Sequence, residues 1–186
     1  MDADRLLSDL NRWAAEQRTS EAAAARSRER SLREQAVETA TFTGLLLDLA
    51  ERAAPVTLRT TAGAAHAGRV VAVGADFVAL VAGGSAGAPA MFVALAAIAG
   101  VRAAEPGAAP AAGDRVANDL DLGGVLAGAA AERPRVRIVT AGDTVVGELR
   151  GAGLDVVTVR ADGVPPALVY VPLASVLEAS LVDSLG

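Results

Sequence analysis

Few residues in this sequence are of a type that could do chemistry. There is no Cys, so disulfides, thiol catalysis and Cys-based metal sites are excluded. His66 is the only histidine, and no carboxylate lies close to it in the sequence. Neither a catalytic triad nor a metal site of paired histidines can be built from it. We therefore expect His66 to be a surface strand residue, and we predict no catalytic residue, no metal and no cofactor.

Two further patterns could mark a site. Asp76 and Asp155 each lie two residues after a glycine, a place where Asp commonly stabilises a turn. The alternative is that the two aspartates form a catalytic pair. The segment from Gly63 to Gly68 has the glycine spacing of a phosphate-binding loop. That loop requires Lys and then Ser or Thr directly after the second glycine, whereas Arg69 follows here. We therefore do not predict a phosphate site.

Three arginines alternate along one predicted strand. Arg133, Arg135 and Arg137 would share one strand face. We interpret them as the charged protection of a solvated sheet edge. The alternative is contact with an anion, a nucleic acid or another partner.

Composition narrows the class of protein. The chain has 186 residues, 52% of them hydrophobic, and a formal net charge of −5. No apolar run reaches the length of a membrane helix, and the acidic start is unlike a secretory signal, so we expect a cytoplasmic protein without a membrane partner. All 17 basic side chains are Arg, which is typical of a GC-rich genome. The negative charge and the 3% aromatic content disfavour nonspecific nucleic-acid binding by phosphate contacts and base stacking.

Residues 1–40 are predicted to form one long, charged helix, because they contain no Gly or Pro and many good helix formers. Leu6, Leu10 and Trp13 fall on one face near its start. We predict that this stripe docks on a protein partner or on a second copy of the chain. Packing against the chain's own strands is the alternative.

The rest of the chain is predicted to contain two units of mostly β-structure. Residues 41–102 read as a short helix followed by about five strands separated by glycine turns. Residues 103–117 are rich in Ala, Pro and Gly and are predicted to be a linker. Residues 118–186 then repeat the first unit.

The repeat is visible as matched positions. Val56 and Leu58 match residues 80 further on, and Gly63, Gly68 and Asp76 match residues 79 further on. At a shift of 78, Val93, Leu95, Ala96 and Ile98 match Val171, Leu173, Ala174 and Val176. We interpret this as an internal duplication of a small barrel. Gly63 and Gly142 would provide positive φ in the first turn, and Gly68 and Gly147 would permit a sharp bend in the second strand.

This arrangement resembles the Sm-like small barrels. The first Sm-like motif resembles residues 56–80, with its glycine turn at Gly63, its bent-strand glycine at Gly68 and an apolar third strand. The short second motif resembles residues 93–101 and 171–176. The resemblance implies an α+β, mostly β fold: two tandem five-stranded barrels behind a long N-terminal helix.

The resemblance also implies pairing of strand edges and, in many members, binding of single-stranded RNA. The RNA pocket of that family uses a polar amide near the third strand and an Arg-Gly pair in the second motif. This sequence departs from that pocket at both places. The apolar Phe77 and Val78 stand where the amide would be, and Ile98, Ala99 and Gly100 stand where the Arg-Gly pair would be. Because the groups that contact RNA are missing, we predict a non-catalytic scaffold or adaptor protein. The alternative is an RNA- or DNA-binding regulator that uses Arg133, Arg135 and Arg137.

Overall fold

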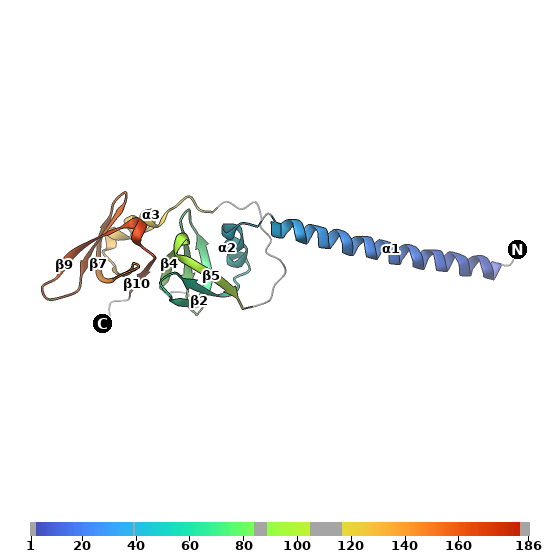
Figure 1. The fold of residues 1–186 in the computed structure, drawn as a ribbon, viewed down its shortest axis with the longest axis horizontal. Coiled ribbons are helices and arrows are strands. Elements are labelled where there is room, and N and C mark those ends of the chain that lie inside the picture. The colour runs from blue at the N-terminus through green and yellow to red at the C-terminus, as the bar shows by residue number, and fades with distance from the viewer. Residues whose placement is uncertain (1–2, 39, 84–88, 105–116, 183–186) are drawn as a thin grey trace.

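The computed structural model describes residues 3–38, 40–83, 89–104 and 117–182. Helix α1 (Ala3–Glu38) is 36 residues long, as expected from its composition. Figure 1 shows α1 running away from the β-structure, with the N-terminus at the far end of the molecule. Its described side chains from residues 17 to 32 are exposed. No described helix is both long enough and apolar enough to cross a membrane.

The two short helices begin with the same motif at positions 80 residues apart. Thr41 caps α2 (Phe42–Glu51), its hydroxyl accepting from the Gly44 N–H at 3.0 Å. Asp121 caps α3 (Leu122–Ala129), its carboxylate accepting from the Gly124 N–H at 2.6 Å. Such caps satisfy an N–H group that the first helical turn leaves without a partner.

Five strands follow each short helix. In the first repeat they are β1 (Pro55–Thr60), β2 (Ala65–Val73), β3 (Phe77–Val81), β4 (Ala90–Ala94) and β5 (Ile98–Ala103). In the second repeat they are β6 (Arg135–Val139), β7 (Thr144–Ala152), β8 (Val156–Ala161), β9 (Ala167–Pro172) and β10 (Glu178–Leu181). One-turn 3₁₀ helices, η1 (Leu95–Ala97) and η3 (Leu173–Ser175), precede β5 and β10, and η2 (Ala130–Glu132) precedes β6.

The strand registers match between the two repeats at the shifts found in the sequence. Val56 pairs with Gly68, and Val136 pairs with Gly147. The register of β2 against β3 shifts just after Val70, and the register of β7 against β8 shifts just after the equivalent Leu149. A bulge conserved in place between the repeats supports the interpretation of an internal duplication.

The glycines of the second strands lie where the main chain comes close. A Cβ on Gly68 would stand 2.6 Å from the Val81 carbonyl oxygen, and one on Gly147 would overlap the Arg160 carbonyl oxygen. The first-turn prediction is right for Gly63, which has φ +86°, and wrong for Gly142, whose φ is not positive. The second turn is one residue shorter and uses a hydrogen bond from the Asp143 N–H to the Thr140 hydroxyl.

The ten strands form one antiparallel sheet in the order β5-β1-β2-β3-β4-β10-β6-β7-β8-β9. Two separate closed barrels were expected, but the sheet is open: in the described residues no ladder joins the fourth strand of a repeat to its own fifth strand. Instead β4 of the first repeat pairs with β10 of the second. Figure 1 shows the two repeats side by side, with β4 and β10 between them.

Each repeat has a buried core, and the second core is shared. The first core lies under α2 and contains Leu46, Leu58, Val70, Leu80 and Val93 among others. The second core lies under α3 and includes Phe77 and Ala79, which belong to the first repeat. The first repeat therefore supplies part of the second core. Of the predicted linker, residues 105–116 lie outside the described residues, whereas Ala103 ends β5.

Candidate functional site

The predicted docking stripe lies on the projecting part of α1. Trp13 is 61% exposed, and it lies in the N-terminal half of a helix that leads away from the sheet. Leu6 and Leu10 lie within the same helix, but their side chains are outside the described residues. Figure 1 shows this half of α1 away from the strands, and it shows no packing of this half against them.

The three arginines are not arranged as expected. Arg135 and Arg137 lie on β6 with their side chains exposed, opposite in direction to the buried Val136 and Ile138. Arg133 precedes the strand in a left-handed conformation (φ +50°), so it does not belong to the strand face. β6 is also not an edge, because it lies between β10 and β7. The edge-protection interpretation is therefore wrong.

Arg135 already has an acidic partner. Its guanidinium donates to the Asp162 carboxylate at 2.9 Å, and both side chains are exposed. An exposed ion pair of this kind contributes little to stability, about 0–1 kcal/mol. It does reduce the positive charge available to an anionic ligand at this place.

His66 is not the surface residue expected from the sequence. Its Nε2 lies 3.1 Å from Glu178 Oε2, and only 20% of its side chain is exposed. The Nε2 atom is buried and makes no aligned hydrogen bond in the described residues, so Glu178 approaches it at short distance without a hydrogen bond. Sequence proximity could not reveal this pair, because the two residues are 112 positions apart in the chain (178 minus 66).

Glu178 is a buried acid at the contact between the repeats. It lies on β10 with 2% of its surface exposed, opposite Val93 of β4. Besides the approach of His66, its Oε1 accepts a hydrogen bond of 2.9 Å from the hydroxyl of Thr60, which is also buried. A buried carboxylate is costly unless it is paired, and both of its partners here belong to the other repeat. We call Thr60, His66 and Glu178 the polar cluster.

A second polar contact joins the repeats at the start of α3. Asp76 is at the turn before β3, and its carboxylate accepts the Leu122 N–H at 2.8 Å. The neighbouring Ala75 N–H donates to the Leu120 carbonyl at 3.0 Å. An acidic side chain at a helix N-terminus is favourable because free N–H groups point toward it. Asp76 therefore acts between the repeats, beyond the turn role expected of it.

Apolar contacts complete this junction. Phe92 of β4 stands opposite Ala179 of β10 and packs against the second core. Its ring meets Phe77 edge to face, with centroids 5.7 Å apart. The junction thus combines strand pairing, the packed rings of the buried Phe77 and the partly buried Phe92, the polar cluster and the Asp76 contact.

The equivalent groups at the outer ends of the sheet are exposed. Tyr170 on β9 matches the partly buried Phe92 and is 65% exposed. Leu154 and Asp155, in the turn before β8, match Ala75 and Asp76; all four are exposed, but only Asp76 holds a helix start. At the other end, Phe42 matches the buried Leu122 but is 42% exposed. β9 and β5 are the two edges of the sheet. The residues that form the junction between β4 and β10 therefore have matched counterparts on the two outer strands, which pair on one side only in the described residues.

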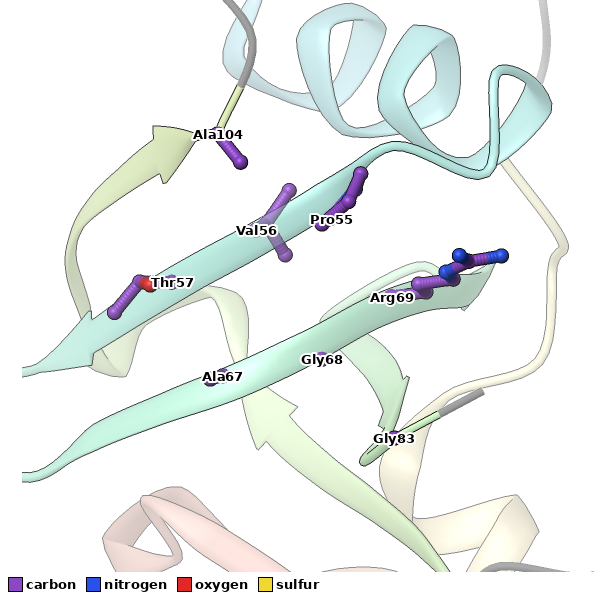
Figure 2. A pocket seen from close by; sticks show the side chains of 8 residues that line it. All are labelled: Pro55, Val56, Thr57, Ala67, Gly68, Arg69, Gly83 and Ala104. Carbon is purple, nitrogen blue, oxygen red and sulfur yellow. The ribbon is translucent and has the colours of Figure 1, made fainter. Parts of the chain in front are cut away.

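Two open hollows occupy equivalent places beside the second strands. Figure 2 shows the first, about 350 Å³, in which Arg69 is the one charged side chain among the described residues that line it. It is lined by Pro55, Val56, Thr57, Ala67, Gly68, Arg69, Gly83 and Ala104. The second, about 210 Å³, is lined by Glu148, Arg160, Ala161, Asp162, Gly163 and Pro166. At the one matched position where both linings carry an ionic side chain, the charges are opposite: Arg69 in the first hollow and Glu148 in the second. The two hollows therefore do not present the same charge to a ligand.

Comparison with known proteins gives no further assignment, because no family model and no curated protein matches this chain.

Proposed function

We propose that this chain is a non-catalytic scaffold that joins to copies of itself head to tail. In this proposal β9 of one chain pairs with β5 of the next, and each repeat is an Sm-like unit. One observation carries the proposal: β4 and β10 already make this kind of junction inside the chain, and the matching edges are exposed at its two ends. The pairing of strand edges implied by the Sm-like resemblance agrees with it.

The register of the new junction follows from the old one. Phe92 pairs with Ala179 and Met91 with Ser180 inside the chain. The matched pairs between chains would be Tyr170 with Val101 and Val169 with Arg102. Tyr170 would then enter the first core of the next chain as Phe92 enters the second core here. Asp155 would accept from the start of α2 beside the exposed Phe42.

The junction between chains differs in one respect. Ala94 donates its N–H to the Leu177 carbonyl at 3.0 Å in the junction within the chain. Its match on β9 is Pro172, which has no N–H to donate. The ladder between chains is therefore one hydrogen bond shorter, and we expect it to be the weaker and reversible junction of the two.

Such a junction is heterologous, since two different surfaces meet. Repetition of a heterologous contact produces a closed ring or an open filament. In either case a copy of α1 projects from every chain, and Leu6, Leu10 and Trp13 are offered many times to a partner protein. Multiple copies raise the strength of binding without any new contact.

The test is the molar mass of the full chain in solution by light scattering. The Ala94 N–H points to β10. Because N–H directions alternate along a strand, the N–H of Phe92, two residues earlier, also points to β10. The N–H of the matched Tyr170 therefore points away from β8, toward the open edge of the sheet. Tyr170→Pro should therefore block the edge and leave β8 paired. We expect an assembled wild type, an assembled Tyr170→Phe control and a single-chain Tyr170→Pro variant with an unchanged circular dichroism spectrum. A wild type that stays a single chain at high concentration contradicts the proposal.

A further inference from the structure

A junction forms between the fourth strand of one repeat and the fifth strand of another. We call the junction-forming side of a fourth strand, β4 or β9, the outgoing edge, and the junction-forming side of a fifth strand, β5 or β10, the incoming edge. Two repeats give four possible outgoing and incoming combinations. The apolar residues and the strand pattern are similar in both repeats, so they discriminate poorly among the four. A chain that associates with its own copies needs some feature that does discriminate.

The charged groups at the edges differ between the repeats. On the incoming edge β10, Glu178 stands opposite Val139 of β6. At the matched place on β5, Gly100 stands opposite Arg59 of β1. The incoming edge of the second repeat is therefore acidic at this place, and that of the first repeat is basic.

The groups that meet the incoming edge differ as well. The first repeat supplies Thr60 and His66 to Glu178. At the matched places the second repeat has Thr140 and Val145. The match of Val145 to His66 follows from equivalent strand pairs, Leu58 with His66 and Ile138 with Val145. At these two places the second repeat thus has no basic group with which to meet a carboxylate.

We propose that the polar cluster of Thr60, His66 and Glu178 determines which repeat edges pair. The combination within the chain brings Glu178 to both of its partners. The combination of β9 with β10 would bury Glu178 beside Val145, and the combination of β4 with β5 would leave His66 facing Arg59 without an acid. An unpaired buried charge or polar atom is strongly unfavourable. Three combinations could form between chains: β9 with β10, β4 with β5 and β9 with β5. The cluster disfavours the first two.

The remaining combination, β9 with β5, has Val145 and Gly100 at these places and buries no carboxylate. It brings Arg59 close to Val145, where the long arginine side chain can keep its charged end in solvent. Here the inference rests on the proposed self-association, since it explains why that association would be head to tail. The role of the cluster inside a single chain does not depend on that association, and it can be tested separately.

The first test is a double-mutant cycle in the Tyr170→Pro background, where only single chains are present. His66→Val, Glu178→Ala and the double variant are unfolded with urea. We expect His66→Val to reduce the folded-to-unfolded ratio at least tenfold when Glu178 is present, and to have no effect or a favourable one when it is absent. If the double variant changes the folded-to-unfolded ratio by the product of the two single-variant factors, the two residues act independently and the proposal is overturned.

The second test moves the acid to the other incoming edge. Arg59→Glu gives β5 an acidic side chain next to Gly100, and Arg59→Val places there the residue found at the matched position 139. We expect Arg59→Glu to weaken assembly at least tenfold by light scattering and Arg59→Val to assemble like the wild type. Equal assembly of the two variants overturns the proposal. A wild type that does not assemble contradicts the proposed function instead, and the double-mutant cycle still decides the role of the cluster.

Discussion

Asp76 of the first repeat accepts a hydrogen bond from the backbone N–H of Leu122, the first residue of helix α3 in the second repeat, at 2.8 Å. A turn residue of one repeat thus holds the start of the other repeat's helix. Both aspartates are exposed, but the carboxylate of the matched Asp155 has no hydrogen-bond partner in the described residues. The two aspartates therefore differ in that only Asp76 holds the start of a helix from the other repeat.

This difference gives a matched prediction. Asp76→Ala should lower the free energy of unfolding by about 0.5–2 kcal/mol, the range found when a helix loses a capping acceptor. Asp155→Ala should leave the unfolding of a single chain unchanged and weaken assembly. Urea unfolding in the Tyr170→Pro background measures the first effect, and light scattering in the wild-type background measures the second. Equal destabilisation by both substitutions would contradict the account.

Gly74 and Gly153 provide a second matched pair. A Cβ on Gly74 would overlap the ring of Phe77 and stand 2.6 Å from the Leu120 carbonyl oxygen, whereas one on Gly153 would come no closer than 3.4 Å to Val156. Gly74→Ala should therefore cost about 1–3 kcal/mol of stability, as overpacking does. Gly153→Ala should have a much smaller effect on a single chain. Thermal unfolding of the two variants compares them directly.

Trp13 is the only tryptophan, so its fluorescence reports on α1 alone. Since it is 61% exposed, we expect emission at the wavelength of a hydrated indole and efficient quenching by iodide. Removal of residues 1–40 should leave the urea unfolding of the sheet unchanged. Blue-shifted emission in the single-chain Tyr170→Pro variant, together with destabilisation on truncation, would show that the helix packs on the chain's own strands.

The nucleic-acid alternative makes a different prediction about Arg135 and Arg137. Arg135 is engaged with Asp162, and the chain has a net charge of −5, so we expect protein purified at low salt to show only protein absorbance. An excess at 260 nm that disappears in high salt would contradict this expectation. If Arg135→Glu together with Arg137→Glu also removed that excess, the arginines would be assigned to phosphate contacts.

The local features of the fold were accessible from the sequence. The long helix, the two short helices and the duplication follow from helix propensity, apolar period and matched glycines. Gly68 and Gly147 were assigned to the second strands because an interior strand glycine marks close backbone approach, and the structure confirms that approach. Such features depend on residues near one another in the chain.

The junction could not be predicted in the same way. Glu178 meets Thr60 and His66 only because β10 completes the sheet beside β4, and a pairing across more than 80 residues leaves no local pattern. His66 was expected at the surface because only its sequence neighbours were considered. The duplication did contain a signal: Glu178 and His66 are two places where the matched positions, Gly100 and Val145, differ in charge or polarity.

The most direct test of head-to-tail association uses the absence of cysteine from the chain. One sample is given Val169→Cys on β9 and another Arg102→Cys on β5, the two positions that would face each other across the new junction. Facing Cα atoms in antiparallel strands lie about 4.5–5.5 Å apart, within the span of a disulfide. We predict that mild oxidation links the two proteins when they are mixed and links neither when it is alone. Linkage of either variant to itself, or no linkage in the mixture, would contradict pairing of β9 with β5.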